Sequence, residues 1–357
     1  MMKITLKIAA LIIMIPLLGL AVLLTYSTLT DYKPAPGSIE LLPLEGEGAT
    51  SQVPDTFSVM IWNIGYCGLG AEMDFFHDGG SMVRPDSTIA AQYLKAVSLF
   101  IGSMRDSVDF IMLQEVDRAS KRSYFKDQMS AIAAELPKFY RTYAVNYRVN
   151  FVPVPFRWPY EPYGATNGGL VTFSKYRPLA SSRIQYPGGF SWPSGLYMLD
   201  RCALEQHYNI CGNRKLILVN THNTAYDETG AIKRQEMQFI SERYGSEKAS
   251  GQLVLLGGDW NQLPPGYHGE TAAQLPPGYT AQALDHAALP SRFNAIFDVT
   301  TPTNRALTEP YQPGRTFTTL IDYFIASPAF RVLKIKTIDL QFKWSDHQPV
   351  ILTLTSQ

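Results

Sequence analysis

Cysteine is scarce in this sequence. Three cysteines in 357 residues are too few for a disulfide scaffold, and no pair has the Cys-x-x-Cys spacing of a zinc site. Cys202 and Cys211 leave two alternatives: a bridge across a hairpin, or two free thiols on neighbouring strands. No candidate base lies near Cys67 in the sequence, so we do not expect a cysteine nucleophile.

Charge is also scarce, and it is balanced. Charged residues make up 17% of the chain, and 31 basic residues against 31 acidic ones give a formal net charge of zero. The usual share of charged residues is about 25%. A chain-wide basic surface of the kind that binds nucleic acid is therefore absent, although a local basic groove is compatible with a neutral total.

The N-terminal segment holds the longest apolar run. Lys3 and Lys7 precede apolar residues from 8 to 24, close to the lower limit of about 17 residues for a membrane-spanning helix. Neither a small-x-small cleavage site nor a lipobox cysteine follows. We therefore expect residues 1–29 to be an uncleaved signal anchor, with a cleaved signal peptide and a secreted enzyme as the alternative. The preceding lysines place the remaining chain on the extracytoplasmic side.

The remaining chain divides into a short linker and one domain. Residues 30–56 are rich in Pro, Gly, Ser and Glu and are predicted to be a tether. From residue 57 to 357, short apolar runs bounded by Gly, Asn, Asp or Pro predict buried strands. These runs are 58–62, 109–114, 169–174, 215–220, 252–258, 322–327 and 349–354, and helical periodicity appears at 87–105, 127–136 and 231–244. Strands mixed with helices predict a layered domain.

Polar residues stand at the edges of these apolar runs. A carboxylate, amide or imidazole in such a place is costly unless it is paired or bound to a metal. Six runs in one chain carry such residues, which predicts a convergent site at one sheet edge. The residues are Asn63, Glu115, Asn220 with His222, Asp259 with Asn261, Asp322, and Asp346 with His347.

The segments IWNIGY, LQEVD, NTHN, GGDWN, IDYF and SDHQPV resemble, in order, those of the endonuclease/exonuclease/phosphatase superfamily. That superfamily includes deoxyribonuclease I, exonuclease III-type repair nucleases, inositol polyphosphate 5-phosphatases and neutral sphingomyelinases. The resemblance spans about residues 57–357. It implies an α+β fold, a four-layered α/β/β/α sandwich of two mainly antiparallel sheets flanked by helices. It also implies divalent-metal-dependent hydrolysis of phosphate esters.

The metal site is expected at Glu115. A hard carboxylate suits Mg²⁺, which keeps most of its waters and takes few protein ligands. Asn63 would supply a neutral oxygen or orient a metal-bound water, and the resemblance implies the same pair. Asp346 is expected near the metal, through water. The sequence does not separate Mg²⁺ from Mn²⁺.

The catalytic groups are expected on the other strand ends. Asp259 would orient or deprotonate the attacking water, and Asn261 would donate to the phosphoryl oxygens. His222 and His347 would bind the phosphate, and one of them would protonate the leaving group. In the family, Asp322 pairs with the last histidine, which raises its pKa. Asp259 and His347 both remain candidates for the general base.

Three substrate hypotheses follow. A lipid-like or small phosphodiester is favoured, because residues 166–178 resemble an NGG-to-Ser-Lys segment of the sphingomyelinases and the anchor keeps the enzyme beside lipid. The apolar stretch 150–164 is either a membrane-contacting loop or a buried packing loop. The alternative is a secreted or surface nuclease, with a groove of Lys121, Arg122, Arg141 and Arg148. A non-catalytic binding module is disfavoured because every polar position of the family motifs is kept.

We expect a monomer whose partners are its substrate and the membrane, with nucleic acid less favoured.

Overall fold

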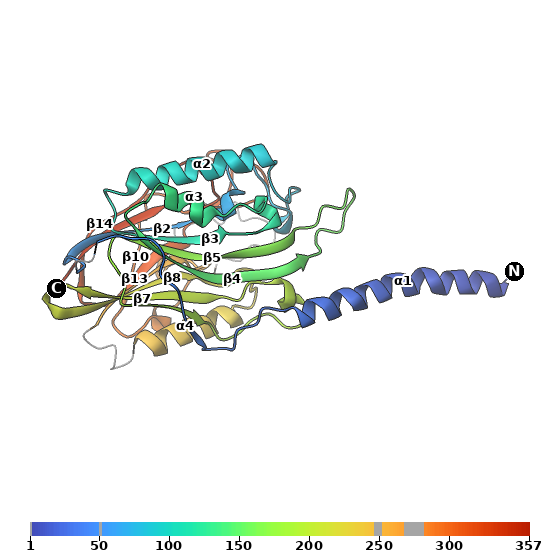
Figure 1. Ribbon diagram of the computed structural model, residues 1–357, viewed down its shortest axis with the longest axis horizontal. Coiled ribbons are helices and arrows are strands. Elements are labelled where there is room, and N and C mark those ends of the chain that lie inside the picture. Colours follow the sequence, from blue (N-terminus) through green and yellow to red (C-terminus); the bar gives the residue numbers. More distant parts are fainter. Residues whose placement is uncertain (1, 50–51, 246–251, 268–281) are drawn as a thin grey trace.

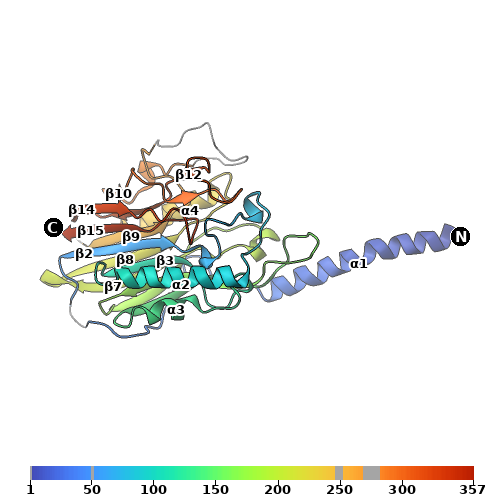
Figure 2. The same ribbon diagram turned by 90° about the horizontal axis from the view of Figure 1, so that it is seen from above.

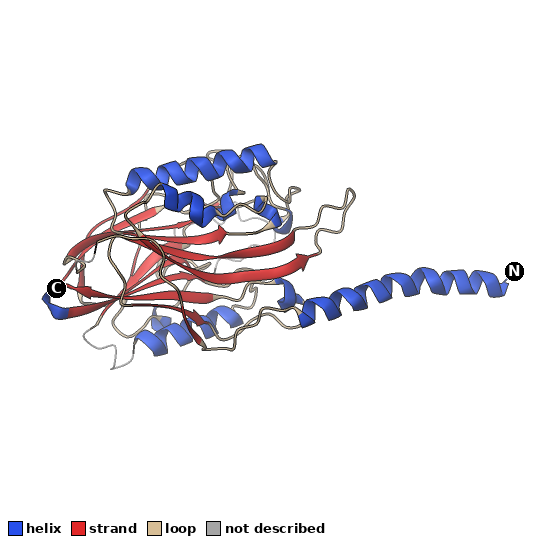
Figure 3. Cartoon of the chain, in the orientation of Figure 1, coloured by secondary structure: helices blue, strands red, loops and turns tan. Residues whose placement is uncertain are grey.

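The computed structural model describes residues 2–49, 52–245, 252–267 and 282–357. Within these residues, two sheets pack face to face and helices cover their outer faces (Figures 1 and 3). Helices α2 (Ser87–Met104) and α3 (Gln128–Ala134) lie on one sheet, and α4 (Ala231–Tyr244) lies on the other. The predicted α/β/β/α sandwich is therefore confirmed.

Both sheets are mainly antiparallel, as predicted. The first runs in the order β14 (Phe330–Thr337), β15 (Val350–Ser356), β2 (Thr56–Asn63), β3 (Phe110–Asp117), β5 (Gly164–Ser174) and β4 (Tyr140–Val152). The second runs in the order β1 (Ile39–Leu41), β6 (Ala180–Gln185), β7 (Cys202–Ile210), β8 (Arg214–His222), β9 (Leu253–Asp259), β13 (Asp322–Ala326) and β10 (Asn294–Ile296). Among the strand pairs of these two sheets in the described residues, β2–β3 and β8–β9 are parallel and the others are antiparallel. A small ribbon joins β11 (Asn304–Arg305) to β12 (Thr318–Thr319).

Each of the seven predicted apolar runs forms a strand, and the three predicted helices are present. The strands that sequence reasoning missed are mostly less uniformly apolar. In β4 the buried and partly buried residues alternate over much of the strand, and β14 is largely exposed at a sheet edge. Such strands take their stability from their neighbours, which a local pattern does not reveal.

Apolar side chains fill all three interfaces between the layers. Between the sheets lie Phe57, Phe110 and Phe324. Trp62 belongs to the cluster under α2 and α3, and Trp260 belongs to the cluster under α4. Both indoles are fully buried and donate to main-chain carbonyls at 2.9–3.0 Å, that of Trp62 to residue 347 and that of Trp260 to residue 323. Full burial of one large apolar side chain contributes about 1.5–3 kcal/mol, so these two tryptophans anchor the chain beside the site described below.

The N-terminal helix α1 (Met2–Leu29) extends away from the sandwich (Figures 1 and 2). Its residues Ala10–Leu29 are long and apolar enough to cross a membrane, a test that a signal sequence also passes. Residues 30–56 differ from the predicted tether, because much of this stretch lies on the domain. Its segment β1 adds an edge strand to β6, and Val53 is fully buried. The few apolar residues of this stretch pack against the domain, which the weak periodicity of the segment does not predict.

The proposed bridge between Cys202 and Cys211 is wrong. Cys202 begins β7 and Cys211 follows its last residue, so the two lie at opposite ends of one strand. At about 3.3 Å per residue they are roughly 30 Å apart, far beyond the reach of a disulfide. The three cysteines are free, and Cys67 and Cys202 are buried.

Candidate active site

The polar strand ends meet at one end of the sandwich. His222 ends β8 opposite Asp259 at the end of β9, and Asp259 is also the register partner of Asp322 at the start of β13. From the other sheet, Asn63 ends β2, and Glu115 lies in an irregularity of β3 where two residues break the register with β5. Parallel and antiparallel pairing thus bring residues far apart in sequence to one edge.

Asp259 is at the centre of the cluster. Its carboxylate accepts a hydrogen bond from Asn63 Nδ2 at 3.0 Å, which joins the two sheets. The Nε2 atoms of His222 and His347 lie 3.3 Å and 3.7 Å from Asp259 Oδ2. The main-chain N–H of Asn261 donates to the other oxygen at 2.9 Å. A fully buried carboxylate with this many donors is held in one orientation.

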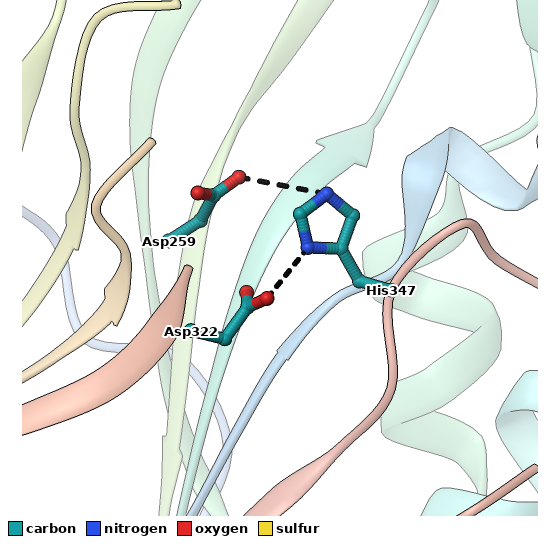
Figure 4. Close-up of side chains that lie close together, drawn as sticks. All are labelled: Asp259, Asp322 and His347. Carbon is teal, nitrogen blue, oxygen red and sulfur yellow. Dashed lines mark hydrogen bonds and ion pairs between the residues drawn. The ribbon is translucent and has the colours of Figure 1, made fainter. Parts of the chain in front are cut away.

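His347 and Asp322 form a buried pair (Figure 4). His347 Nδ1 lies 2.8 Å from Asp322 Oδ2, while Nε2 faces Asp259 and also lies 3.0 Å from the side-chain amide of Asn304. Burial alone would lower the pKa of His347, but the charges of Asp322, Asp259 and Asp346 more than offset it and raise that pKa well above its usual range. The imidazolium is therefore the favoured form, a cationic donor at the centre of the site.

Asp259, Asp322 and His347 lie close enough together to be considered as a metal site. The short Nδ1 contact to Asp322 is instead typical of a His–Asp pair, here beside a second carboxylate, that of Asp259. A histidine with a raised pKa also competes poorly as a ligand, because metal binding requires the neutral ring.

A second group of carboxylate oxygens fits a divalent cation better. Glu115 is held at φ +54° and its side chain is partly exposed. Asp346 is buried, and burial raises its pKa to about 7, with His347 opposing this shift and the charge of Glu115 adding to it. The charge of Glu115 disfavours the ionised form of Asp346, a cation beside the two carboxylates would relieve this, and hard oxygen donors suit Mg²⁺.

Both the oxygen and the nitrogen of the Asn63 side-chain amide are hydrogen-bonded to protein groups, unlike the free oxygen of a direct metal ligand. Its side-chain oxygen accepts from Gly65 N–H at 3.0 Å, and its Nδ2 donates to Glu115 at 3.2 Å as well as to Asp259. Asn63 therefore lies between Glu115 and Asp259 and donates a hydrogen bond to each carboxylate. Of the two roles expected for Asn63, this geometry favours the orienting one.

His222 is also buried in the cluster. Its Nε2 lies 4.0 Å from Glu115 Oε1. Burial, together with the positive charges of Arg201, His347 and Arg122, lowers the pKa of His222 well below its usual range. The two histidines thus differ in protonation, with His347 cationic and His222 neutral.

The side-chain amides of two asparagines donate hydrogen bonds to main-chain carbonyl groups. Asn261 has φ +50°, and its side-chain amide donates to Asn223 O at 2.9 Å. Asn220 joins the two sheets, because its Nδ2 donates to the carbonyls of Leu113 and Val171 in the opposite sheet.

Arg201 is a site residue that sequence reasoning missed. It is buried just before β7, with Nη1 3.5 Å from His222 O, and its charge lies near those of Glu236, Asp259 and Glu115. No carboxylate lies within 4.0 Å of its guanidinium among the described residues, and burial lowers its pKa. The sequence carries no local signal for it, because the strand that follows mixes polar and apolar residues.

Two of the four cations expected to line a nuclease groove are paired within the domain. Arg122 is buried and pairs with Asp117 at 2.8 Å, and its Nη1 donates to Tyr163. Arg141 forms an ion pair with Glu45 at 3.2 Å. These two arginines are occupied in holding the structure together.

The sequence model of the endonuclease/exonuclease/phosphatase family matches residues 60–347, which include all eight predicted site residues. The chain belongs to this family. Members of the endonuclease/exonuclease/phosphatase family are hydrolases of phosphate esters that use divalent metals. No curated protein matches the chain.

Similar solved structures show the same fold at low sequence identity. The endonuclease/exonuclease/phosphatase from Beutenbergia cavernae is 16% identical, with 84% of this chain and 72% of that chain covered and a TM-score of 0.55. The family protein from Bacteroides vulgatus is 16% identical, with 85% and 99% covered and a TM-score of 0.53. The human Nocturnin catalytic domain is 15% identical, with 88% and 98% covered and a TM-score of 0.51. The likeness concerns the fold alone.

Proposed function

We propose that this protein is a divalent-metal-dependent phosphodiesterase that acts on a lipid-like or small phosphodiester. The observation that carries the proposal is the junction of the two sheets at Asp259, where one buried carboxylate faces two histidines and an amide. A phosphodiester repels nucleophiles, so its hydrolysis needs a base or orienting group for water, cationic donors for the phosphoryl oxygens, and a proton for the leaving group.

Asp259 is suited to orient or deprotonate the attacking water. It is fixed by Asn63 and by the main chain of residue 261, so it needs no reorganisation. His347, held by Asp322, is a cationic donor that can bind a phosphoryl oxygen or protonate the leaving group. Because His347 is protonated, Asp259 is the better candidate of the two for the general base.

Glu115 would hold the divalent cation, with Asp346 beside it and Asn63 keeping Glu115 in place. When bound, the cation would withdraw charge from the phosphoryl oxygens. Neutral His222 can donate to the same oxygens. Asn261, whose side-chain amide is satisfied by the main chain, would contribute only if that bond were exchanged for one to substrate.

Arg201 would supply fixed positive charge for the phosphate. A buried guanidinium without a carboxylate partner is costly, and a bound phosphate group offers the bidentate partner that Arg prefers. Its closeness to His222 places this charge at the edge of the catalytic cluster.

The choice of a lipid-like substrate rests on α1, on the neutral net charge and on the pairing of Arg122 and Arg141 with carboxylates. The glycines of the NGG segment have a packing reason: a Cβ at Gly169 would lie 2.2 Å from Ala144 O, and one at Gly168 would lie 2.6 Å from Asp117 Oδ1. This segment therefore carries little information on the substrate. With α1 in a membrane and the domain on the extracytoplasmic side, lipid would be present at high effective concentration.

A substrate panel tests the proposal. The full chain in detergent or vesicles is assayed with Mg²⁺ and with Mn²⁺ against sphingomyelin, phosphoinositides, bis-p-nitrophenyl phosphate, plasmid DNA and RNA. We expect kcat/KM to be highest for a lipid or a small diester. Plasmid or RNA cleavage that is fastest by about tenfold or more would establish the nuclease alternative and remove the lipid assignment.

A further inference from the structure

The loop between β4 and β5 exposes aromatic side chains at its tip. Trp158 is 93% exposed and Phe156 is 74% exposed, with Tyr160 beside them. The rings of Phe156 and Tyr160 stack with 6.4 Å between centroids, and Tyr160 Oη donates to Pro153 O at 2.9 Å. The tip is therefore organised by its own contacts while its largest apolar side chain faces solvent.

The base of this loop is built into the sandwich. Val152 and Tyr163 are buried in a cluster with Val83 and Tyr147. Tyr163 also accepts a hydrogen bond from Arg122 Nη1 at 2.7 Å. Of the two expectations for residues 150–164, packing therefore describes the base, while the aromatic tip lacks any covering element among the described residues.

A second exposed tryptophan lies beside the end of α1. Trp192 is 62% exposed, and its Nε1 donates to Thr28 Oγ1 at 3.2 Å. Ser27 Oγ lies 3.2 Å from Tyr197 Oη. The last turn of α1 also faces residues 148–151 of β4, which lead into the aromatic loop. The helix, Trp192 and the loop therefore share one end of the molecule (Figure 1).

The catalytic cluster lies toward this same end. Residues 116 and 117, next to Glu115, pair with Gly169 and Gly168 of β5, and β5 continues outward to Gly164 before the loop begins. At about 3.3 Å per residue, the loop starts roughly 15 Å beyond the level of Glu115. A surface that contacts the loop tip would therefore also face the catalytic cluster.

We propose that Phe156, Trp158 and Trp192 form an interfacial membrane contact that holds the active-site end of the sandwich against the lipid bilayer. Amphipathic aromatic rings concentrate at the level of lipid headgroups, and Arg157 beside Trp158 can reach phosphates there. The bilayer is favoured as the occupant because α1 leaves the domain beside these residues. The inference rests on the proposed anchoring by α1 and adds a specific orientation, in which substrate enters from the membrane.

Tryptophan fluorescence in vesicles tests the contact. Trp62 and Trp260 are fully buried and Trp344 is partly buried against the cluster under α2, so lipid-dependent changes report mainly on Trp158 and Trp192. The full chain is placed in phosphatidylcholine vesicles with and without bromine on the upper acyl carbons. We expect brominated lipid to quench the wild-type emission, and W158S/W192S to lose most of this quenching. The double variant should also hydrolyse a vesicle substrate about tenfold more slowly while keeping its rate on bis-p-nitrophenyl phosphate.

A matched control places a tryptophan at the opposite end. Leu179 is 55% exposed, and its N–H donates to the carbonyl of His207 on the far half of β7. L179W in the W158S/W192S background should fluoresce without quenching by brominated lipid. Equal quenching of wild type and W158S/W192S would overturn the contact, as would burial of the two tryptophans by self-association without lipid. Because bis-p-nitrophenyl phosphate needs no membrane, its hydrolysis tests the proposed function separately.

Discussion

Replacing Asp322 with Asn changes one charge at the most buried pair of the site. The side chain of Asp322 is fully buried and that of His347 is 6% exposed, with 2.8 Å between the paired atoms. Asn keeps the shape but cannot offset an imidazolium. Removing one partner of a buried ion pair costs about 3–5 kcal/mol. We expect D322N to fall near the lower value, because His347 can lose its proton and avoid an unpaired buried charge.

The larger effect should be on turnover. Without Asp322, the ring of His347 loses both the contact that fixes its Nδ1 and the main charge that raises its pKa. Loss of such a positioned acid or donor lowers kcat by on the order of 10²–10⁴-fold. The assay is kcat on bis-p-nitrophenyl phosphate, with the melting temperature measured on the same samples.

A surface carboxylate provides the control for D322N. Asp106 follows α2, its side chain is 92% exposed, and D106N should match wild type in both measurements. Wild-type kcat in D322N, with a folded protein, would refute the role given to the pair. A stability loss without a loss of kcat would assign Asp322 to structure alone.

Three further predictions concern other groups. R201M should melt at a higher temperature than wild type, because an unpaired buried cation is removed, while kcat/KM falls by about 10–100-fold; a lower melting temperature would instead indicate a structural arginine. Burial raises the pKa of Glu205, but hydrogen bonds from His207, Arg243 and Tyr244 outweigh it and hold that pKa at about 2. This depressed pKa stabilises the fold above the ordinary value near 4.5, by about 3 kcal/mol at pH 7, and the gain is lost as pH falls toward 2. The stability gap between wild type and E205Q, measured by urea unfolding, should therefore close over that range, and a constant gap would contradict the assignment. Finally, the chain should fractionate with membranes, with protease reaching its C-terminal domain from outside the cytoplasm; a soluble protein beginning near Thr30 would instead indicate a secreted enzyme.

The site was largely predictable because its residues interrupt apolar runs. Asp259 and His222 end buried strands, and a polar group there is conspicuous in any sequence. Strand pairing then brings these ends together without further information. The orientation of the Asn63 side chain was not predictable. It depends on hydrogen bonds to Glu115 and Asp259, which are distant in the sequence, and to the nearby N–H of Gly65.

The missed features depend on contacts between distant segments. Arg201 is conspicuous because no acid in the described part of the chain lies within ion-pair distance of it, and no local sequence pattern indicates that. Residues 39–41 form a strand only because β6 offers a free edge. The aromatic tip at 156–160 could not be separated from a packing loop, because a sequence does not show that its base is buried while its tip is exposed.

The central claim is that metal-dependent hydrolysis of a phosphodiester occurs at the Asp259 cluster beside Glu115. The most direct measurement is hydrolysis of bis-p-nitrophenyl phosphate by the full chain, after treatment with EDTA and again after Mg²⁺ or Mn²⁺ is restored, for wild type and for E115Q. We predict that EDTA abolishes wild-type hydrolysis, that the metal restores it, and that E115Q recovers only at much higher metal concentration or not at all. Undiminished hydrolysis in excess EDTA, or a metal response of E115Q equal to that of wild type, would contradict the account.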